Sequence, residues 1–302
     1  MNCIAITAHQ ISSSLEYTVL KASKNPKNII LIHVDKKSNI EPFLHLKSKN
    51  VIFIEKRIEV SWGDVSQIDA TLELIKASLE YQYQYFHLIS GDDILISQKR
   101  LDTLPSNGKY EYIAFQESRT SPINPDLRVL FNYPSLCFKK NNSFIEKVCK
   151  KVIFPYINIR FKLRLYSKLD IQLYKGTNWF SLTKGCIEMI NSFVARNPHY
   201  KLKFARSLCA DEVFFHSIIY NSEFKNNIYK HPKSLNIGSI AEHALRYVDW
   251  KSGPDYPRTL QKEDFQRVKN SEMLFSRKIS SSISLNELRY FDIESDTIND
   301  SI

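Results

Sequence analysis

The sequence predicts an α/β fold with an open central sheet flanked by helices. Strand and helix signals alternate along residues 1–120, which is the order typical of α/β proteins. The run at 28–35 is almost wholly apolar and ends on Asp35, and the run at 86–89 ends in Ser90-Gly91. Such continuous apolar runs are typical of parallel strands buried on both faces. Ligands of these sheets bind at the carboxyl ends of the strands, so we expect a site near these residues.

The expected elements of this first part follow one another through short connections. A helix is expected at 12–23. A second, strongly amphipathic helix is expected at 64–79, with Asp64 or Ser66 as its cap. The expected strands lie at 4–8, 28–35, 51–55, 86–91 and 110–115.

The second part of the chain begins with a less regular stretch. Residues 121–175 are basic and show no clear period. Order then returns with a strand at 179–182, a helix near 184–194, a helix that starts near Asp211, a strand at 245–250, a loop at 252–258 and a helix at 263–268. No repeat or low-complexity linker interrupts the sequence, so we expect one domain over 1–302, with a frayed tail at 291–302.

Composition excludes several classes of protein. With only 7 Gly and no G-x-G-x-x-G or P-loop pattern, nucleotide binding through a glycine-rich phosphate loop lacks support. The 5 cysteines are scattered and form no C-x-x-C pair, which argues against a disulfide framework or a zinc site. The apolar N-terminal run is too short for a signal peptide. We therefore expect a cytoplasmic protein in a reducing compartment.

A basic segment at 139–168 supplies much of the net charge of +10. Apolar residues interleave with its lysines and arginines, and Glu146 is its only acid. One interpretation is a solvated helix face. The other is peripheral contact with an anionic membrane at the inner face of the cell membrane, or with an acidic acceptor. Nucleic acid is not expected as a partner, because no binding motif accompanies the charge.

Two adjacent acids, Asp211 and Glu212, open the otherwise apolar segment 209–219. Asp211 is expected at or near the N-cap of the helix, where a carboxylate accepts from unpaired backbone N–H groups. That role leaves the charge of Glu212 unexplained. A carboxylate at the edge of an apolar wall has the environment of a general base.

A third acidic feature is Ser90-Gly91-Asp92-Asp93, directly after a buried strand. Two acids at this position suit a divalent metal that holds a diphosphate, and they equally suit a tight turn. Near the C-terminus, Arg258 and Lys278 each stand beside apolar residues. Such cations can offset a diphosphate leaving group without metal, although surface solvation is the ordinary role of a single cation.

Taken in order, these fragments resemble the core-2/I-branching β-1,6-N-acetylglucosaminyltransferases, a family that also contains the peptide-O-xylosyltransferases. The resemblance extends over roughly residues 1–280. Its motifs are Ile32-His33-Val34-Asp35-Lys36-Lys37-Ser38, Trp62-Gly63-x-x-Ser66, His87-Leu88-Ile89-Ser90-Gly91-x-Asp93, Gly176-x-x-Trp179-Phe180, Asp211-Glu212, Arg246-Tyr247-x-x-Trp250, Pro257-Arg258-Thr259 and Phe275-x-Arg277-Lys278.

The resemblance implies a GT-A type glycosyltransferase fold with a Rossmann-like mixed central sheet. It also implies an inverting mechanism, a UDP-sugar donor and no metal cofactor. Residues 1–120 would then form the nucleotide-sugar-binding half, and 121–290 the acceptor-binding and catalytic half.

Roles carry over to the matching positions. Glu212 matches the general base, and Arg258 and Lys278 match the cations that bind the donor diphosphate. Asp35 and His9 are expected near the nucleoside. The expected neighbours of the donor sugar and the acceptor are Trp250, Asp93, Trp179 and Asp211.

Departures from the family pattern concern the acceptor. Ile94-Leu95 replaces the usual aromatic-Pro, and Ser252 replaces a second aromatic residue that follows Trp250 in mammalian members. A bacterial-type member is expected, with UDP-N-acetylglucosamine as the first donor and UDP-xylose as the alternative. The expected acceptor is a surface polysaccharide or lipopolysaccharide, as a glycan or lipid-linked glycan. The alternative of another class is a non-catalytic basic protein that binds a membrane or a polyanion.

Overall fold

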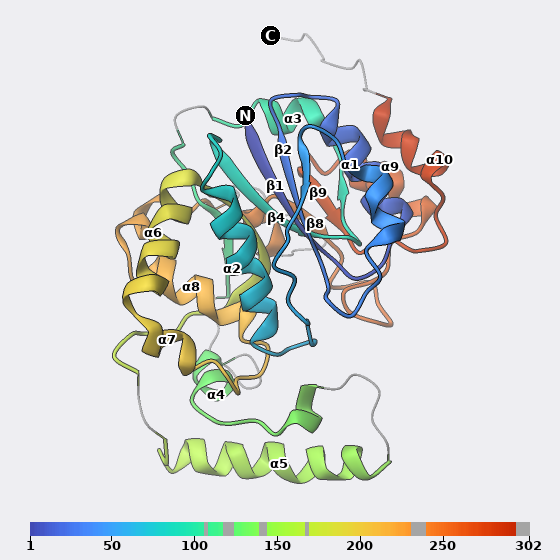
Figure 1. The fold of residues 1–302 in the computed structure, drawn as a ribbon. Coiled ribbons are helices and arrows are strands. Elements are labelled where there is room, and N and C mark those ends of the chain that lie inside the picture. Colours follow the sequence, from blue (N-terminus) through green and yellow to red (C-terminus); the bar gives the residue numbers. More distant parts are fainter. Residues whose placement is uncertain (106–107, 117–123, 139–143, 167–168, 231–239, 294–302) are drawn as a thin grey trace, which may run out of the picture.

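A six-stranded mixed sheet is the centre of the protein, which a computed structural model describes for residues 1–105, 108–116, 124–138, 144–166, 169–230 and 240–293 (Figure 1). The strand order is β3-β2-β1-β4-β7-β6. Its strands are β1 (Asn2–Ala8), β2 (Ile29–Val34), β3 (Val51–Phe53), β4 (Tyr85–Ser90), β6 (Tyr112–Phe115) and β7 (Gly176–Thr183).

Strands β1 to β4 are parallel, whereas β7 runs antiparallel to both of its neighbours, β4 and β6. The expected strands of the first 120 residues are all present within a few residues of their expected ends. The mixed sheet also agrees with the fold that the resemblance implies.

Both faces of the sheet are buried, which explains the continuous apolar runs. Cys3 and Ala5 of β1 belong to one hydrophobic core, while Ile4 and Ile6 belong to another on the opposite face. Successive strand side chains point to opposite faces, so a strand covered on both sides must be apolar at nearly every position.

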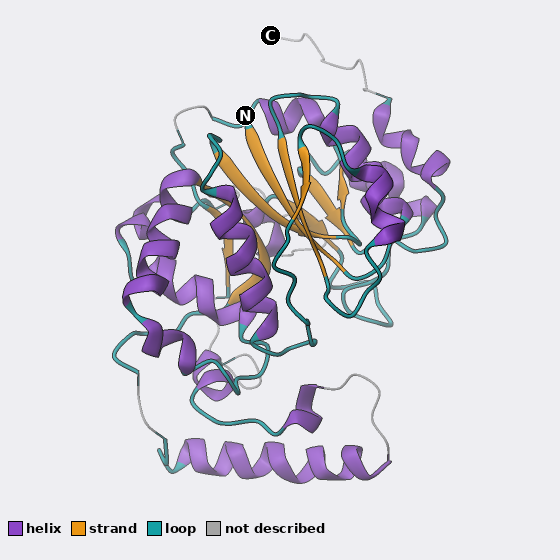
Figure 2. Ribbon diagram, in the orientation of Figure 1, coloured by secondary structure: helices purple, strands orange, loops and turns teal. Residues whose placement is uncertain are grey.

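Helices cover the two faces in two groups, with the strands as a layer between them (Figure 2). Helices α2 (Ser66–Ser78), α6 (Lys184–Arg196) and α8 (Asp211–Tyr220) pack on the first core. Helix α1 (Ser13–Ser23) packs on the second, and Ser12 caps it by accepting from Leu15 N at 3.1 Å. The expected cap of α2 is wrong, because Val65 occupies the cap position and Asp64 instead accepts from Ser66 N.

A second sheet of three strands lies against the second core, in the order β5-β9-β8. Its strands are β5 (Ile94–Leu95), β8 (Arg246–Val248) and β9 (Phe275–Arg277). The fully buried Arg246 joins the two sheets, since its guanidinium donates to the carbonyls of Leu88 in β4 and Phe180 in β7. The small sheet thereby brings the C-terminal part of the chain to the end of β4.

Shorter helices complete the described structure. They are α3 (Gln98–Asp102), α4 (Pro125–Val129), α7 (Pro198–Leu202), α9 (Phe265–Lys269) and α10 (Leu285–Leu288). The 3₁₀ turns are η1 (Glu41–Leu46), η2 (Ser135–Phe138), η3 (Glu223–Asn227), η4 (Ile240–Ala244), η5 (Lys262–Asp264) and η6 (Arg289–Asp292). The tail expected to fray lies outside the described residues from 294 onward.

The expectation of an irregular stretch at 121–175 is wrong for its centre. Helix α5 (Phe144–Lys162) is 19 residues long, and in Figure 1 it lies at the bottom of the view, outside the layer of α6, α7 and α8. One side of α5 packs on a separate cluster around Leu127, Phe131 and Tyr133. Within the described parts of the chain, no helix is both long enough and apolar enough to cross a membrane.

Candidate active site

Glu212 lies in the first turn of α8, at the end of a tightly held segment. Cys209 has a positive φ of 50°, and its N–H donates to the Gly63 carbonyl at 2.8 Å. The Trp62-Gly63 turn therefore fixes where α8 begins. Ala210 occupies the N-cap position. Asp211, which was expected at or near the cap, is the first residue of the helix.

Two cations hold the Glu212 carboxylate through the same oxygen. Lys175 Nζ lies 2.8 Å and Arg128 Nη1 lies 3.2 Å from Glu212 Oε2. Lys175 is buried, whereas the Glu212 side chain is 29% exposed. Among the described residues, no hydrogen bond or ion pair reaches Oε1. Within the described residues, the carboxylate is therefore held through Oε2 alone.

Asp211 is buried beside Glu212 and differs from it chemically. Burial, and then repulsion by Glu212, raise the pKa of Asp211 to about 7. Its Oδ1 has no hydrogen-bond partner among the described residues. Asp211 thus holds a proton over much of the range below neutral pH, which removes its repulsion of the Glu212 carboxylate.

Lys175 and Arg128 are functional candidates that the sequence reasoning missed. Lys175 directly precedes Gly176 of the Gly-x-x-Trp-Phe motif, and Arg128 lies in α4. A lysine before a strand and an arginine in a short helix carry no local signal. Only tertiary structure brings them to an acid that lies 37 and 84 residues further along the chain.

The Ser90–Asp93 segment forms a turn in which both acids face cations. Asp93 is buried and accepts from Ser90 N and Ser90 Oγ at 2.8 and 3.0 Å. Arg277 Nε lies 3.3 Å from Asp93 Oδ1, and Lys278 Nζ lies 3.8 Å from Asp92 Oδ2. Burial raises the pKa of Asp93, although Arg277 and Ser90 oppose it. No cluster of three or more metal-binding side chains occurs in the described ranges.

Trp179 joins this acidic turn through Arg277. The Arg277 guanidinium lies 4.6 Å from the centre of the Trp179 ring, in the geometry of a cation–π contact. Arg277 therefore contacts both Trp179 and Asp93. The expectation that Trp179 and Asp93 both lie near the donor sugar or the acceptor stays a prediction.

Arg258 and Lys278 lie on neighbouring chain segments. Leu260 N donates to the Lys278 carbonyl at 2.7 Å, which sets the two segments side by side. Lys278 is partly exposed, whereas Arg258 Nη1 lies 3.1 Å from Asp264 Oδ1 and 3.7 Å from Asp249 Oδ2. Arg258 is thus a paired cation, and its guanidinium keeps further N–H groups for a ligand.

Trp250 follows Asp249 in the same loop and is exposed. Burial opposes the charge of Asp249, but hydrogen bonds from Ser252 and Lys251 N, together with Arg267, lower the pKa of Asp249 to about 2. The Arg258 N–H donates to the Asp249 carbonyl at 2.9 Å. This charged loop holds Trp250 and Arg258 at fixed positions relative to each other.

Asp35 and His9 directly follow the carboxyl ends of the neighbouring parallel strands β2 and β1. Asp35 N donates to the Ala8 carbonyl at 2.8 Å, and the Ser38 hydroxyl donates to the His9 carbonyl. The Asp35 carboxylate accepts from Lys37 N at 3.0 Å and from Val60 N at 3.3 Å. His9 is exposed. Both residues therefore lie at the sheet edge where ligands of α/β folds bind.

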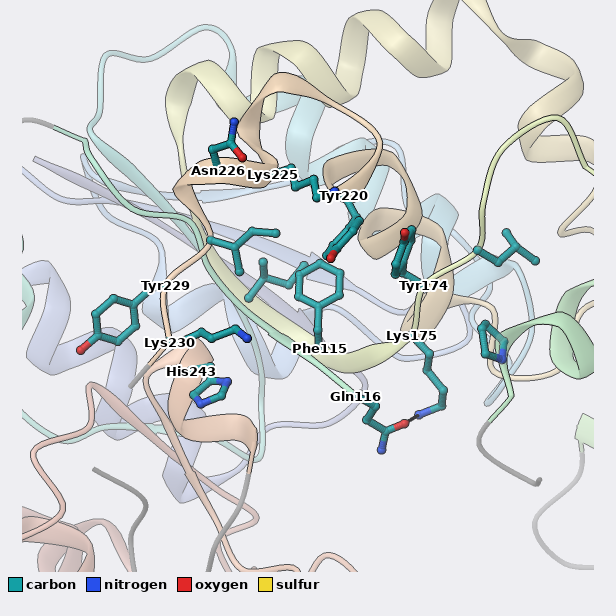
Figure 3. A pocket seen from close by; sticks show the side chains of 14 residues that line it. Phe115, Gln116, Tyr174, Lys175, Tyr220, Lys225, Asn226, Tyr229, Lys230 and His243 are labelled. Atoms are coloured by element: carbon teal, nitrogen blue, oxygen red, sulfur yellow. Dashed lines mark hydrogen bonds between the residues drawn. The ribbon is translucent and has the colours of Figure 1, made fainter. Parts of the chain in front are cut away.

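A pocket of about 410 Å³ adjoins Glu212 through Lys175 (Figure 3). Lys175 Nζ contacts Gln116 Oε1 at 2.9 Å on the pocket wall as well as the Glu212 carboxylate. Phe115, Tyr174 and Tyr220 lie together on this wall, and the rings of Tyr174 and Tyr220 stack at 3.8 Å. The pocket has the size and the mixed apolar and polar lining of a small-molecule site.

A family model described as Branch: Core-2/I-Branching enzyme matches residues 5–273. The chain belongs to the Core-2/I-branching enzyme family. Membership makes it a glycosyltransferase of the core-2/I-branching type, with a sugar donor and a glycan acceptor, and the mixed sheet flanked by helices is consistent with the GT-A fold. The comparison with curated proteins returns no match.

The match to the Core-2/I-branching enzymes includes Glu212, Trp250 and Arg258, while Lys278 lies beyond its end. Among the described residues, no contact joins Glu212 directly to Arg258 or Lys278. The site residues instead form separate groups: Glu212 with Asp211, Asp93 with Trp179, Arg258 with Trp250, and Asp35 with His9.

Proposed function

We propose that the protein transfers a sugar from a UDP-sugar to a hydroxyl group of a glycan with inversion at the anomeric carbon, and that Glu212 is the general base. The observation that carries this proposal is the placement of the Glu212 carboxylate. Lys175 and Arg128 hold its Oε2, beside a pocket with aromatic walls. An oriented, part-exposed carboxylate within reach of a ligand pocket fits the removal of a proton from an acceptor hydroxyl.

In the proposed reaction, Glu212 takes the proton of the acceptor hydroxyl as the hydroxyl oxygen bonds to the anomeric carbon. The bond from that carbon to the diphosphate oxygen breaks on the opposite face, and UDP leaves with the bonding electrons. A donor linked in the α configuration therefore gives a β-linked product. Arg258 and Lys278 stabilise the charge that develops on the diphosphate.

Metal independence is part of the proposal. It is supported by the cations that already face the two acids of the Gly91-Asp92-Asp93 turn, since Lys278 neighbours Asp92 and Arg277 neighbours Asp93. We expect full transfer activity in excess EDTA. Loss of activity that Mn²⁺ restores would instead assign a metal to Asp92 and Asp93.

The proposal extends to the donor and the acceptor. UDP-N-acetylglucosamine is the first candidate and UDP-xylose the second, with Asp35 and His9 next to the nucleoside. The aromatic pocket at Phe115, Tyr174 and Tyr220 is the proposed acceptor site, because flat rings bind the apolar faces of sugars. A glycan or lipid-linked glycan of bacterial surface polysaccharide synthesis is the proposed acceptor. The free state of all five cysteines suits the cytoplasm.

A screen of nucleotide sugars tests the proposal. A ligand that binds only the folded protein raises the melting temperature, so the donor should stand out in a thermal-shift series and should then be turned over. Glu212→Gln should lower transfer by about 10²–10⁴-fold while UDP binding persists. Glu80→Gln, at an exposed position near the end of α2, is the matched control and should stay active. Near-normal transfer by Glu212→Gln would remove Glu212 from the mechanism.

The rival proposal is a non-catalytic protein that binds membranes or polyanions. It draws its support from the basic helix α5 and gives no reason for the Lys175–Glu212–Arg128 arrangement. It requires that no nucleotide sugar be turned over. Turnover of any one of them decides against it.

A further inference from the structure

Helix α5 has two apolar sides, and only one of them packs on the protein. Ile153, Phe154 and Phe161 pack on the cluster that contains Leu127, Phe131, Tyr133 and the buried Ile157 of α5 itself. The other side carries large apolar side chains that are between 45% and 81% exposed: Phe144, Val148, Val152, Tyr156 and Ile159. We call these five residues the α5 stripe.

The spacing of the α5 stripe places its members on one face. Steps of four, four, four and three residues, at about 100° per residue, keep all five within an arc of roughly 120°. Ile153 and Ile157 fall on the opposite side by the same geometry, in agreement with their packing. Leu163, which directly follows the helix, is also exposed. Such a contiguous exposed patch marks a site of interaction rather than scattered surface apolar residues.

Basic side chains flank the α5 stripe. Lys147, Lys151 and Lys162 are exposed, and helical geometry sets them along one margin of the stripe. Arg160 lies at the other margin, with its guanidinium 5.8 Å from the centre of the Tyr156 ring. Glu146 is the only acid of the helix. An apolar face bordered by lysines and arginines is the pattern of a helix that lies in the interface of an anionic membrane.

We propose that α5 docks the protein on an anionic lipid bilayer, with the α5 stripe inserted among the acyl chains and Lys147, Lys151, Lys162 and Arg160 at the lipid phosphates. The positive charges beside the α5 stripe favour an anionic bilayer over a second copy of the chain as the partner. Two copies joined at the stripe would bring these like charges together. The charges along α5 place the helix in the membrane plane. Membrane docking through α5 does not depend on the sugar chemistry. It would place the enzyme at the surface where a lipid-linked acceptor is found.

Co-sedimentation with vesicles tests the proposal. The full chain should bind phosphatidylcholine vesicles that contain phosphatidylglycerol, should bind pure phosphatidylcholine vesicles much less, and should lose binding as salt rises. Each lysine at an anionic surface contributes about fivefold in affinity, so Lys147→Gln with Lys151→Gln should bind roughly 25-fold more weakly. Lys47→Gln with Lys49→Gln, at exposed positions near β3, changes the same charge and should bind like the wild type.

Val152→Asp tests the apolar half of the proposal and should abolish binding even in low salt. Circular dichroism and the melting temperature check that each variant is folded, and the exposed lysine variants keep the test valid if Val152→Asp is not. Equal binding by all variants would overturn the proposal, as would the absence of wild-type binding to anionic vesicles. Self-association without lipid that Val152→Asp abolishes would assign the stripe to a second copy and would also overturn it.

Discussion

The ammonium group of Lys175 lies 2.8 Å from Oε2 of Glu212, and Arg128 Nη1 lies 3.2 Å from the same oxygen. The two oxygens of this carboxylate are therefore not equivalent. Oε2 is held from the start of β7 and from α4, so Oε1 is the oxygen that we expect to accept the proton. Lys175 also contacts Gln116, which ties the position of the base to the pocket wall.

Lys175→Met should lower kcat by about 10–100-fold, because it removes the ammonium group that lies 2.8 Å from Glu212 Oε2 and positions the base, and a displacement of about 1 Å in a catalytic site can cost roughly 100-fold. The KM for the donor should change little, since among the described residues Lys175 has no hydrogen bond or ion pair with Asp35, His9, Arg258 or Lys278 and instead contacts Glu212 and Gln116. Lys175→Arg should recover part of the loss. Lys184→Met, at the other end of β7, is the matched control. Wild-type kcat in Lys175→Met would show that Lys175 does not position Glu212.

Asp211→Asn should change how stability depends on pH. The pKa of Asp211 is raised from 3.8 to about 7 in the folded protein, so the folded state binds this proton more tightly than the unfolded state. The stabilising effect of this bound proton is complete below about pH 4, the unfolded pKa, and is lost as the pH rises through the folded pKa of about 7. Because Asn does not ionise, the stability of Asp211→Asn does not fall in this way as the pH rises.

Urea unfolding at pH 5 and pH 8 measures the effect. We expect the stability of Asp211→Asn relative to the wild type to rise between the two values. Asp255→Asn, at an exposed loop position, should show no such trend. A relative stability that stays flat or falls from pH 5 to pH 8 would mean that Asp211 is ionised throughout in the folded protein.

Lys278→Met should weaken UDP binding by about tenfold and leave uridine binding unchanged, because a cation beside the diphosphate acts on the phosphates alone. Isothermal titration with UDP and with uridine separates the two contributions. Lys262→Met, an exposed lysine that pairs with Glu287 at 3.3 Å, is the control. An equal loss for UDP and uridine would point to a disturbed fold around Asp92 instead of a lost phosphate contact.

Sequence patterns predicted the parallel strands because both faces of the sheet are buried. Ile30, Leu31 and Ile32 alternate between two cores, so the run is apolar at every position and its strand character is visible locally. Glu212 was singled out from the sequence because an acid at the edge of an apolar helix has few structural reasons to be there, and its role as the base stays a prediction.

Helix α5 and the partners of the site acids were not predictable in the same way. Apolar residues occur on both the packed side and the exposed side of α5, so no single apolar stripe is visible, and Pro155 stands inside the helix. Asp92 and Lys278 are 186 residues apart in the sequence, and Arg128 and Glu212 are 84 residues apart. Such ion pairs depend on the topology, and no local pattern encodes them.

Gly176→Ala should destabilise the protein severely. Gly176 opens β7 directly after Lys175, and a Cβ there would lie 1.6 Å from the Ala114 carbonyl oxygen and 2.5 Å from His216 Nε2. The first of these is a backbone atom of β6, so the strands would have to separate. We expect a loss on the order of 4 kcal/mol or failure to accumulate as folded protein.

Gly185→Ala is the matched control for this change. A Cβ at Gly185 would meet the Phe224 ring at an ordinary 3.6 Å, and alanine favours the helix α6 by about 0.5–1 kcal/mol. The two variants should therefore shift the melting temperature in opposite directions. If Gly176→Ala were as stable as the wild type, β6 and β7 could not lie as close as the structure places them, and the position of Lys175 against Glu212 would have to change with them.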